Sequence, residues 1–382
     1  MNGTALLCLL VFCNTVAIGA FGPLLPEIAR AQGLADWQLG LLAGAFGFAR
    51  MVGDVPAGAL AGRRLGSTLA VSPLVLLAGV ALLGTAGPFS VLLLGRFLLG
   101  LAHTFAMVGG LSALLLSHRG QPASMRLNTF EFSGMLGVLA GLLAVGSLPT
   151  RWGWNGSLLL ASAPILIPVV LGPVLRRRFP DQASAPPEPA SRAPALDGSP
   201  ARTGEGLVRL MFALGAGMAL SWSAVSQFLI PLRGEREFGL DRAGISRLLA
   251  LAQVVDLAAL LPVGWLADRA GRRPVLAAVA LVLGLGTWGV GLGSFAPFAV
   301  GAALAGLGLA GWMLPLGVLR DQTPPAGLAW RMGLYRVGVD AAVFVGPLAC
   351  GALGPVGTGV FTGLVGAGLV GLGVRLGRGG PG

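Results

Sequence analysis

Long apolar runs separated by short polar breaks make up most of this chain. A helix that crosses a bilayer needs about 20 predominantly apolar residues. Two of the breaks are only short turns, Gly87-Pro88 and Ser294 to Pro297. Runs of spanning length lie at approximately 4–26, 38–60, 69–88, 90–116, 128–148, 154–175, 207–231, 243–266, 275–294, 296–319, 329–353 and 355–376. The pattern predicts an all-α integral membrane protein with twelve transmembrane helices.

The longest polar break divides these runs into six and six. Residues 179–206 are rich in Pro, Ala and Ser and hold too few apolar residues for a core, which favours a disordered linker. We therefore expect an N-terminal six-helix bundle at 1–178 and a C-terminal six-helix bundle at 207–382.

The two halves repeat each other weakly. The segment Pro56–Arg63 matches Pro262–Arg269 at an offset of 206 positions, and Gly100 matches Gly306 at the same offset. Paired six-helix units around a central linker are typical of transporters, whose solute site lies near the bilayer midplane between the repeats.

Composition supports the membrane interpretation. Hydrophobic residues make up 55% of the chain and charged residues only 11%, against about 25% charged residues in soluble domains. The chain also has 63 glycines, and small residues let membrane helices approach closely. A soluble globular protein is excluded by this balance.

The distribution of charge predicts an orientation rather than a nucleic-acid surface. All 26 basic residues are Arg, in short groups between apolar runs. With the N-terminus in the cytoplasm, most of them fall on cytoplasmic segments, which follows the positive-inside rule. We therefore expect a multi-pass protein of the cytoplasmic (inner) membrane with both termini cytoplasmic. The arginines assigned to the outer segments are Arg30, Arg151, Arg233, Arg236 and Arg242.

The sequence offers little for catalysis or metal binding. Its three cysteines all lie inside apolar runs, and its two histidines show no metal-ligand spacing. The phosphate-loop pattern GxxxxGK[ST] is absent, as it must be in a chain without Lys. We expect no enzyme activity, no cofactor, no metal and no nucleic-acid partner.

One loop resembles a family motif. Residues 264–273 read GWLADRAGRR, which is similar to the GxLaDrxGrr loop of the major facilitator superfamily, here between helices 8 and 9. The resemblance covers the chain and implies a cytoplasmic gate, with Asp268 against the start of helix 5 near Asn128. A carboxylate is stabilised at a helix N-terminus. The gate residues it implies are Gly264, Asp268, Arg269, Gly271, Arg272 and Arg63.

Other copies of family motifs are weaker. In the first-half copy of the loop, Gly62 stands in the Asp position and is followed by Arg63, so the corresponding gate is expected to be weaker. Arg63 also fits a simple positive-inside anchor. Arg96 with Gly100 resembles the helix 4 motif RxxxG, which is associated with proton coupling. The antiporter motif of helix 5 is poorly represented.

Several charged residues lie within the apolar runs, where they are costly and by default indicate function. They are predicted to couple protons or to form salt bridges between the two halves; the alternative is permanent, purely structural pairing. Arg50 and Asp54 lie four positions apart on one helix face, as do Arg336 and Asp340. The full set is Asp54, Arg50, Asp256, Asp340, Arg336 and Glu131.

In the family, helices 1, 4, 7 and 10 line the central cavity. Arg96 and His103 share one face of helix 4, so Arg96 could bind an anionic group; a histidine satisfied within the bundle is equally compatible with the pattern. Ser and Asn side chains also bond helix to helix. The cavity residues we predict are Asn14, Arg96, His103, Ser221, Trp222, Gln227 and Trp312.

The sequence thus predicts a secondary transporter of a small organic solute that works by alternating access. Proton-coupled efflux of a drug or metabolite is the preferred function, with protons as coupling ion and a monomer in the bilayer. The alternatives are a proton-coupled importer or exchanger of an organic anion, an ion-independent facilitator, and a non-transporting membrane sensor.

Overall fold

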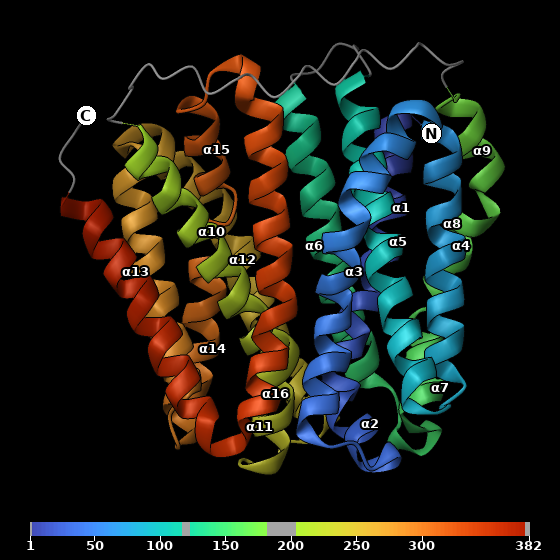
Figure 1. The fold of residues 1–382 in the computed structure, drawn as a ribbon. Helices are drawn as coiled ribbons and strands as arrows, with labels where there is room; N and C mark the ends of the chain where they lie inside the picture. Colours follow the sequence, from blue (N-terminus) through green and yellow to red (C-terminus); the bar gives the residue numbers. More distant parts are fainter. Residues whose placement is uncertain (1, 117–122, 182–203, 379–382) are drawn as a thin grey trace. The chain divides into compact units, whose positions relative to one another are not determined.

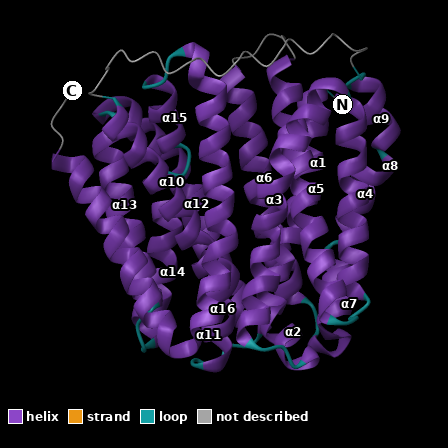
Figure 2. Cartoon of the chain, viewed as in Figure 1, coloured by secondary structure: helices purple, strands orange, loops and turns teal. Residues whose placement is uncertain are grey.

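The computed structural model describes residues 2–116, 123–181 and 204–378. The described chain is helical and contains no strand, as Figure 2 shows. The α-helices are α1 (Gly3–Phe21), α2 (Leu25–Gln32), α3 (Asp36–Arg63), α4 (Leu65–Gly84), α5 (Phe89–Leu116), α6 (Ala123–Ser147), α7 (Gly153–Ala161), α8 (Leu166–Val170), α9 (Gly172–Arg178), α10 (Glu205–Ala224), α11 (Ile230–Arg236), α12 (Arg242–Ala270), α13 (Arg272–Val290), α14 (Phe295–Leu309), α15 (Leu314–Asp321) and α16 (Pro325–Arg378). The shorter turns are η1 (Gly22–Leu24), η2 (Thr150–Trp152), η3 (Ala163–Ile165) and the π-helical η4 (Val225–Leu229).

The predicted spans are present as helices. Eleven segments of the described chain are long and apolar enough to cross a membrane. The one predicted span outside these eleven is 38–60, and it corresponds to α3, which has 28 residues and carries Arg50 and Asp54 within its apolar run. The all-α, twelve-helix membrane class is therefore confirmed.

Proline and glycine determine where the spans break. The predicted sixth span divides into α7, η3, α8 and α9, with Pro164, Pro168 and Pro173 in the last three pieces. Proline lacks the N–H that continues a helix. The last two predicted spans are continuous in α16 apart from a kink at Gly354, whose φ of 64° suits glycine. This kink lies where the sequence pattern placed the boundary.

The chain forms two compact units. Unit 1 comprises Met1–Ser184 together with Pro231–Ala250, and unit 2 comprises Ala185–Ile230 together with Leu251–Gly382. Within unit 1, α1 packs along α6, and α5 packs along α3 and α4. Within unit 2, α13 packs along α14 and α16, and α10 packs along α16 (Figure 1). The predicted boundaries at 178 and 207 stay a prediction, because most of the linker lies outside the described residues.

The same helix contact occurs in both sequence repeats. A Cβ on Gly100 of α5 would lie 2.4 Å from the carbonyl oxygen of Phe46 in α3. A Cβ on Gly306 of α14 would lie 2.2 Å from the carbonyl oxygen of Ala252 in α12. Both pairs are related by the offset of 206 seen in the sequence. Each glycine lets two helix backbones touch, which explains its place in the repeat.

A similar contact joins α1 and α6 and gives a testable stability prediction. A Cβ on Gly141 would lie 2.0 Å from the carbonyl oxygen of Val16, which is backbone and cannot move aside. We expect Gly141→Ala to lower the free energy of unfolding by roughly 1–3 kcal/mol, because the helices must separate. Thermal unfolding of the purified protein in detergent measures this.

The matched control is Gly58→Ala in α3, where an added Cβ would meet nothing within 4 Å. Alanine is the better helix former by about 1 kcal/mol, so this variant is expected to be neutral or stabilised. Equal melting temperatures for the two variants would contradict the close α1–α6 contact.

Candidate functional site

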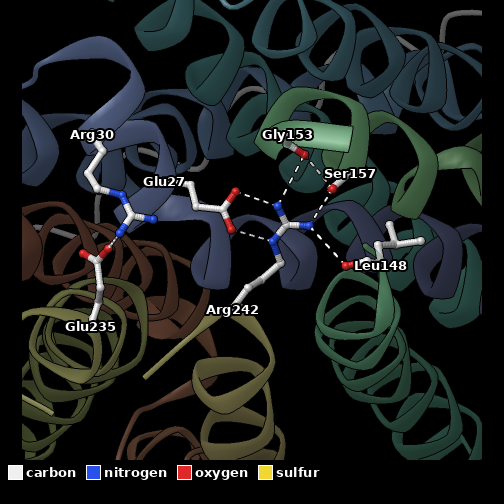
Figure 3. Close-up of polar contacts among 7 residues, drawn as sticks. All are labelled: Glu27, Arg30, Leu148, Gly153, Ser157, Glu235 and Arg242. Atoms are coloured by element: carbon white, nitrogen blue, oxygen red, sulfur yellow. Dashed lines mark hydrogen bonds and ion pairs between the residues drawn. The ribbon is translucent and has the colours of Figure 1, made fainter. Parts of the chain in front are cut away.

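The strongest polar network of unit 1 centres on Arg242, the first residue of α12. Its guanidinium donates to both carboxylate oxygens of Glu27 in α2, from Nε at 2.6 Å and from Nη2 at 2.6 Å. Nη1 donates to Oγ of Ser157 in α7 at 2.6 Å. Longer bonds reach the carbonyl oxygens of Leu148, at 3.5 Å, and Gly153, at 3.4 Å. Figure 3 shows these five bonds converging on one side chain, and we name them the Arg242 network.

Local sequence explains the positions of Arg242 and Leu148. The Asp241 carboxylate accepts a bond of 2.7 Å from the amide of Gly244, which caps α12 so that it begins at Arg242. Leu148 directly follows the last residue of α6, where helix carbonyls lack partners in the helix. A cation is favoured at such an end. Arg242 therefore neutralises Glu27 and caps a helix with the same planar group.

Burial separates this network from its neighbours. The Arg242 side chain is 2% exposed. Two further ion pairs join Pro231–Ala250, the part of the second half that belongs to unit 1, to the rest of that unit. Arg30 pairs with Glu235 (Figure 3), and Arg236 pairs with Asp36 at 2.8 Å. Arg30 is 67% exposed and Arg236 is 40% exposed, and exposed pairs contribute only about 0–1 kcal/mol. The pair of Arg242 with Glu27 is therefore the most buried of the three.

The predicted cavity residues of unit 1 form a second group, on α1 and α5, next to Phe46 of α3. Arg96 is fully buried, with its guanidinium carbon 3.9 Å from the ring centroid of Phe21 and 5.0 Å from that of Phe46. His103 lies 3.3 Å from Oδ1 of Asn14, and its ring is 5.5 Å from that of Phe46. The structure therefore brings Arg96 and His103 together at the Phe46 ring, with Asn14 beside His103. That these residues line a solute cavity stays a prediction.

The predicted cavity residues of unit 2 are more scattered. Ser221 is buried and shares a hydrogen bond with Thr287 of α13, so it ties two helices together. Trp222 is half-buried one residue further along α10. Gln227 lies in the π-helical turn η4, a structure frequent at functional sites. Trp312 lies half-buried in the turn between α14 and α15.

The charged residues within the spans differ in their surroundings. Asp340 of α16 is fully buried, and Arg336 lies half-buried one turn before it. On α3, Asp54 is half-buried, and the Arg50 guanidinium carbon lies 5.6 Å from the ring centroid of Phe46. Glu131 of α6 is half-buried as well.

Asp256 of α12 is distinct among them. It is 6% exposed, and Gln253 donates to its Oδ2 at 3.3 Å. Its Oδ1 is buried without a hydrogen-bond partner among the described residues. The bond from Gln253 is neutral, so the carboxylate gains no opposite charge from it. Burial of an ionised carboxylate in such surroundings is unfavourable unless it is paired.

The family-type loop lies at the α12–α13 turn. Gly271 has φ of 90°, a conformation that favours glycine. The Arg269 guanidinium lies 4.2 Å from the Trp265 ring, and Arg272 pairs with Asp321 of α15. Asp268 is exposed and borders a cavity of about 360 Å³ within unit 2. The contact predicted between Asp268 and the start of helix 5 stays a prediction, as does the role of Gly264.

The corresponding turn between α3 and α4 has a different carboxylate. Gly62 and Arg63 are exposed there. Asp181, beyond α9, accepts bonds from Ser67 Oγ at 2.6 Å and from the Ser67 amide at 3.0 Å. These bonds hold the pKa of the Asp181 carboxyl below its usual range. The α4 N-terminus is therefore capped from the start of the linker, at a position the motif does not predict.

Among the described residues, no group of three or more His, Cys, Asp or Glu side chains could hold a metal ion. A family model described as "Major Facilitator Superfamily" matches residues 7–241 and 210–378. This chain belongs to the Major Facilitator Superfamily. The match confirms the resemblance inferred from the loop at 264–273, and it makes the chain a multi-pass membrane transporter rather than a soluble enzyme.

Proteins named as transporters resemble the chain over different lengths. It is 28% identical to the 4-hydroxybenzoate transporter PcaK of Pseudomonas aeruginosa, over 91% of this chain and 85% of that protein. It is 30% identical to Polyol transporter 5 of Arabidopsis thaliana, over 39% of this chain and 29% of that protein. Among solved structures, a POT family transporter in complex with 5-aminolevulinic acid superimposes with a TM-score of 0.83. That structure covers 98% of this chain and 95% of its own at 12% identity, which shows the fold alone.

Sequence reasoning missed the Arg242 network. It treated Arg30, Arg236 and Arg242 only as markers of orientation and did not single out Glu27 or Ser157. A signal was present, since Glu27 is an acidic residue at the end of the first apolar run. Its partner is 215 positions away, which no local pattern reveals.

Proposed function

We propose that this superfamily member is a proton-coupled secondary transporter, which moves a small organic solute across the cytoplasmic membrane by alternating access. The observation that carries proton coupling is Asp256, a buried carboxylate whose hydrogen bond comes from the neutral Gln253. Ionisable groups inside a membrane span mark ion or proton pathways. A proton taken up at Asp256 removes the unfavourable buried charge, so occupancy by a proton favours one conformation over another.

The solute is proposed to be handled by the cluster around Asn14, Arg96 and His103. The preferred direction remains efflux. A second candidate is proton-coupled import or exchange of an organic anion, and a specific observation favours it: the relative PcaK, similar over 91% of this chain, is a 4-hydroxybenzoate transporter. Arg96 and the Phe21 and Phe46 rings supply a positive charge and aromatic surface in one place.

The orientation that we propose rests on the Arg asymmetry. With both termini cytoplasmic, the α1–α2 end and the start of α12 lie on the outer side, and the loop at 264–273 lies on the cytoplasmic side. The Arg242 network then belongs to the outer end of the protein. We propose that a monomer is the transporting unit.

Reconstitution into proteoliposomes tests the function. The pH gradient is imposed in each direction, with 4-hydroxybenzoate as the first probe and a polyol and a lipophilic cation as further classes. We expect one class to accumulate against its own gradient only when the pH gradient is present. Movement against protons indicates efflux, and movement with protons indicates import.

Two outcomes oppose the proposal. Transport that ignores the pH gradient supports the ion-independent facilitator. Absence of movement for every probe class, in liposomes shown to hold folded protein, supports the non-transporting sensor.

A further inference from the structure

Three residues that follow α9, Phe179, Pro180 and Asp181, lie against the first turns of α1 and α4 within unit 1. We name these three residues the strap. Figure 1 shows the start of α1 and the end of α9 at the same end of this unit. The strap makes three kinds of contact there, through an aromatic ring, a backbone carbonyl and a carboxylate.

The ring of Phe179 anchors the strap by burial. Phe179 is 9% exposed and belongs to a hydrophobic cluster that includes Leu6 of α1 and Leu65 and Leu69 of α4. A Cβ on Gly3 of α1 would lie 3.3 Å from the ring carbon Cζ. Removing such an apolar ring from water is favourable, so the ring fixes the strap between α1 and α4.

The backbone of the strap lies directly on the start of α4. A Cβ on Gly66 would lie 2.1 Å from the carbonyl oxygen of Phe179 and 3.1 Å from the Cα of Arg176. Both are backbone atoms, so a side chain at position 66 fits only if the strap moves away. Gly62, near the end of α3, shows the opposite, because a Cβ there would meet nothing within 4 Å.

The carboxylate of Asp181 caps α4. It accepts hydrogen bonds from the amide of Ser67 at 3.0 Å and from Ser67 Oγ at 2.6 Å. Ser67 is the third residue of α4, and its amide is one that an N-cap side chain ordinarily bonds. The residue at the N-cap itself, Arg64, makes no such bond. The cap of α4 therefore comes from a residue 114 positions away in the sequence.

The start of α4 has no negative charge of its own. Arg63 and Arg64 precede it, and its first turn holds no acidic residue. Gly62 stands where the repeated segment of the second half has Asp268. Positive charge near a helix N-terminus is unfavourable, and a carboxylate there is favourable. Asp181 thus supplies the charge that the α3–α4 turn lacks.

We propose that the strap is a conformational device that makes the order of the α3–α4 turn depend on attachment of the start of the linker. With the strap in place, α4 is capped and the ends of α1, α4 and α9 are held together. With the strap released, the Ser67 amide loses its acceptor, and the cluster around Phe179 opens to water. This inference depends only on contacts within unit 1 and on no particular solute.

Limited digestion with trypsin tests the strap, because trypsin cleaves after arginine where the chain opens locally. Exposed arginines lie at both contacts, namely Arg176, Arg177 and Arg178 at the end of α9, and Arg63 and Arg64 at the α3–α4 turn. Gly66→Ala keeps every strap residue but places a Cβ where the Phe179 carbonyl lies. We expect cleavage after both groups of arginines to become about tenfold faster, because the strap is displaced. Mass spectrometry of the fragments from the purified protein in detergent measures each rate.

Three further variants make the test specific. Gly62→Ala is the matched control, since it adds the same methyl group without a contact, and its cleavage rates are expected to be unchanged. Asp181→Ala removes the cap and is expected to accelerate cleavage after Arg63 and Arg64 about fivefold. Asp181→Asn keeps a capping oxygen and should stay within about twofold of the unmodified protein. Gel filtration and circular dichroism establish that each variant is folded, and Asp181→Ala carries the test if Gly66→Ala does not fold.

Each outcome decides the proposal. Faster cleavage after both groups of arginines in Gly66→Ala and in Asp181→Ala, with Gly62→Ala unchanged, supports it. Acceleration at the end of α9 alone overturns it, because the strap would then attach the linker without ordering the α3–α4 turn. Unchanged cleavage in the folded variants also overturns it, and so does equal acceleration by Gly62→Ala, which would reflect a general loosening of the turn.

Discussion

Asp256→Asn is expected to abolish transport driven by a pH gradient while leaving exchange of solute for solute intact. Asparagine has the size and hydrogen-bonding capacity of a protonated aspartic acid but cannot take up or release a proton. Gln253 would still bond the side chain, so the packing of α12 is preserved. Gradient-driven flux in proteoliposomes should fall to the level of the no-gradient control, and counterflow of labelled solute should continue.

The controls for Asp256 are other carboxylates of the membrane spans. Asp54→Asn alters a half-buried side chain on α3, and Asp340→Asn alters a fully buried one on α16. We expect both variants to retain a response to the pH gradient. If Asp256→Asn transports normally and one of these variants does not, the proton site lies at that carboxylate instead. Loss of counterflow as well would indicate damage to folding or solute binding rather than to coupling.

The fold was predictable because the bilayer imposes a simple constraint on sequence. Every spanning helix must be apolar over most of its length, so the spans could be read from long runs. The kink at Gly354 and the shared offset of Gly100 and Gly306 followed from the positions of single glycines. The division of the sixth span was not predicted, because a run containing Pro164, Pro168 and Pro173 is still apolar enough to count as one.

The candidate site was less predictable, because its contacts join distant positions. His103 lies 3.3 Å from Oδ1 of Asn14, so the first and fourth predicted helices are in contact there, and a cavity between them stays a prediction. Ser221 is buried and hydrogen-bonded to Thr287 of α13, and its place in a solute cavity stays a prediction. Only a facing helix could supply that information. Arg242 shows most clearly that contacts between distant positions are hard to predict. Its charge helped to predict the orientation, but its five acceptor atoms belong to residues 85 to 215 positions away in the sequence.

Arg242→Met is expected to lower the free energy of unfolding by about 3–5 kcal/mol, the usual cost of leaving one member of a buried ion pair without its partner. The methionine fills part of the space but offers nothing to Glu27, Ser157 or the carbonyl oxygen of Leu148. Arg236→Met, at an exposed pair, should cost only about 0–1 kcal/mol. Denaturant titration of the purified protein in detergent measures both.

The double variant Glu27→Gln/Arg242→Met distinguishes loss of attraction from burial of a lone charge. The introduced glutamine side chain is neutral, so the double variant should be more stable than Arg242→Met alone, although it has lost one more native side chain. If the two single losses simply add, Glu27 and Arg242 do not interact, and the bidentate geometry at 2.6 Å carries no coupling energy. Recovery in the double variant would instead place the instability of Arg242→Met in the unpaired Glu27 carboxylate.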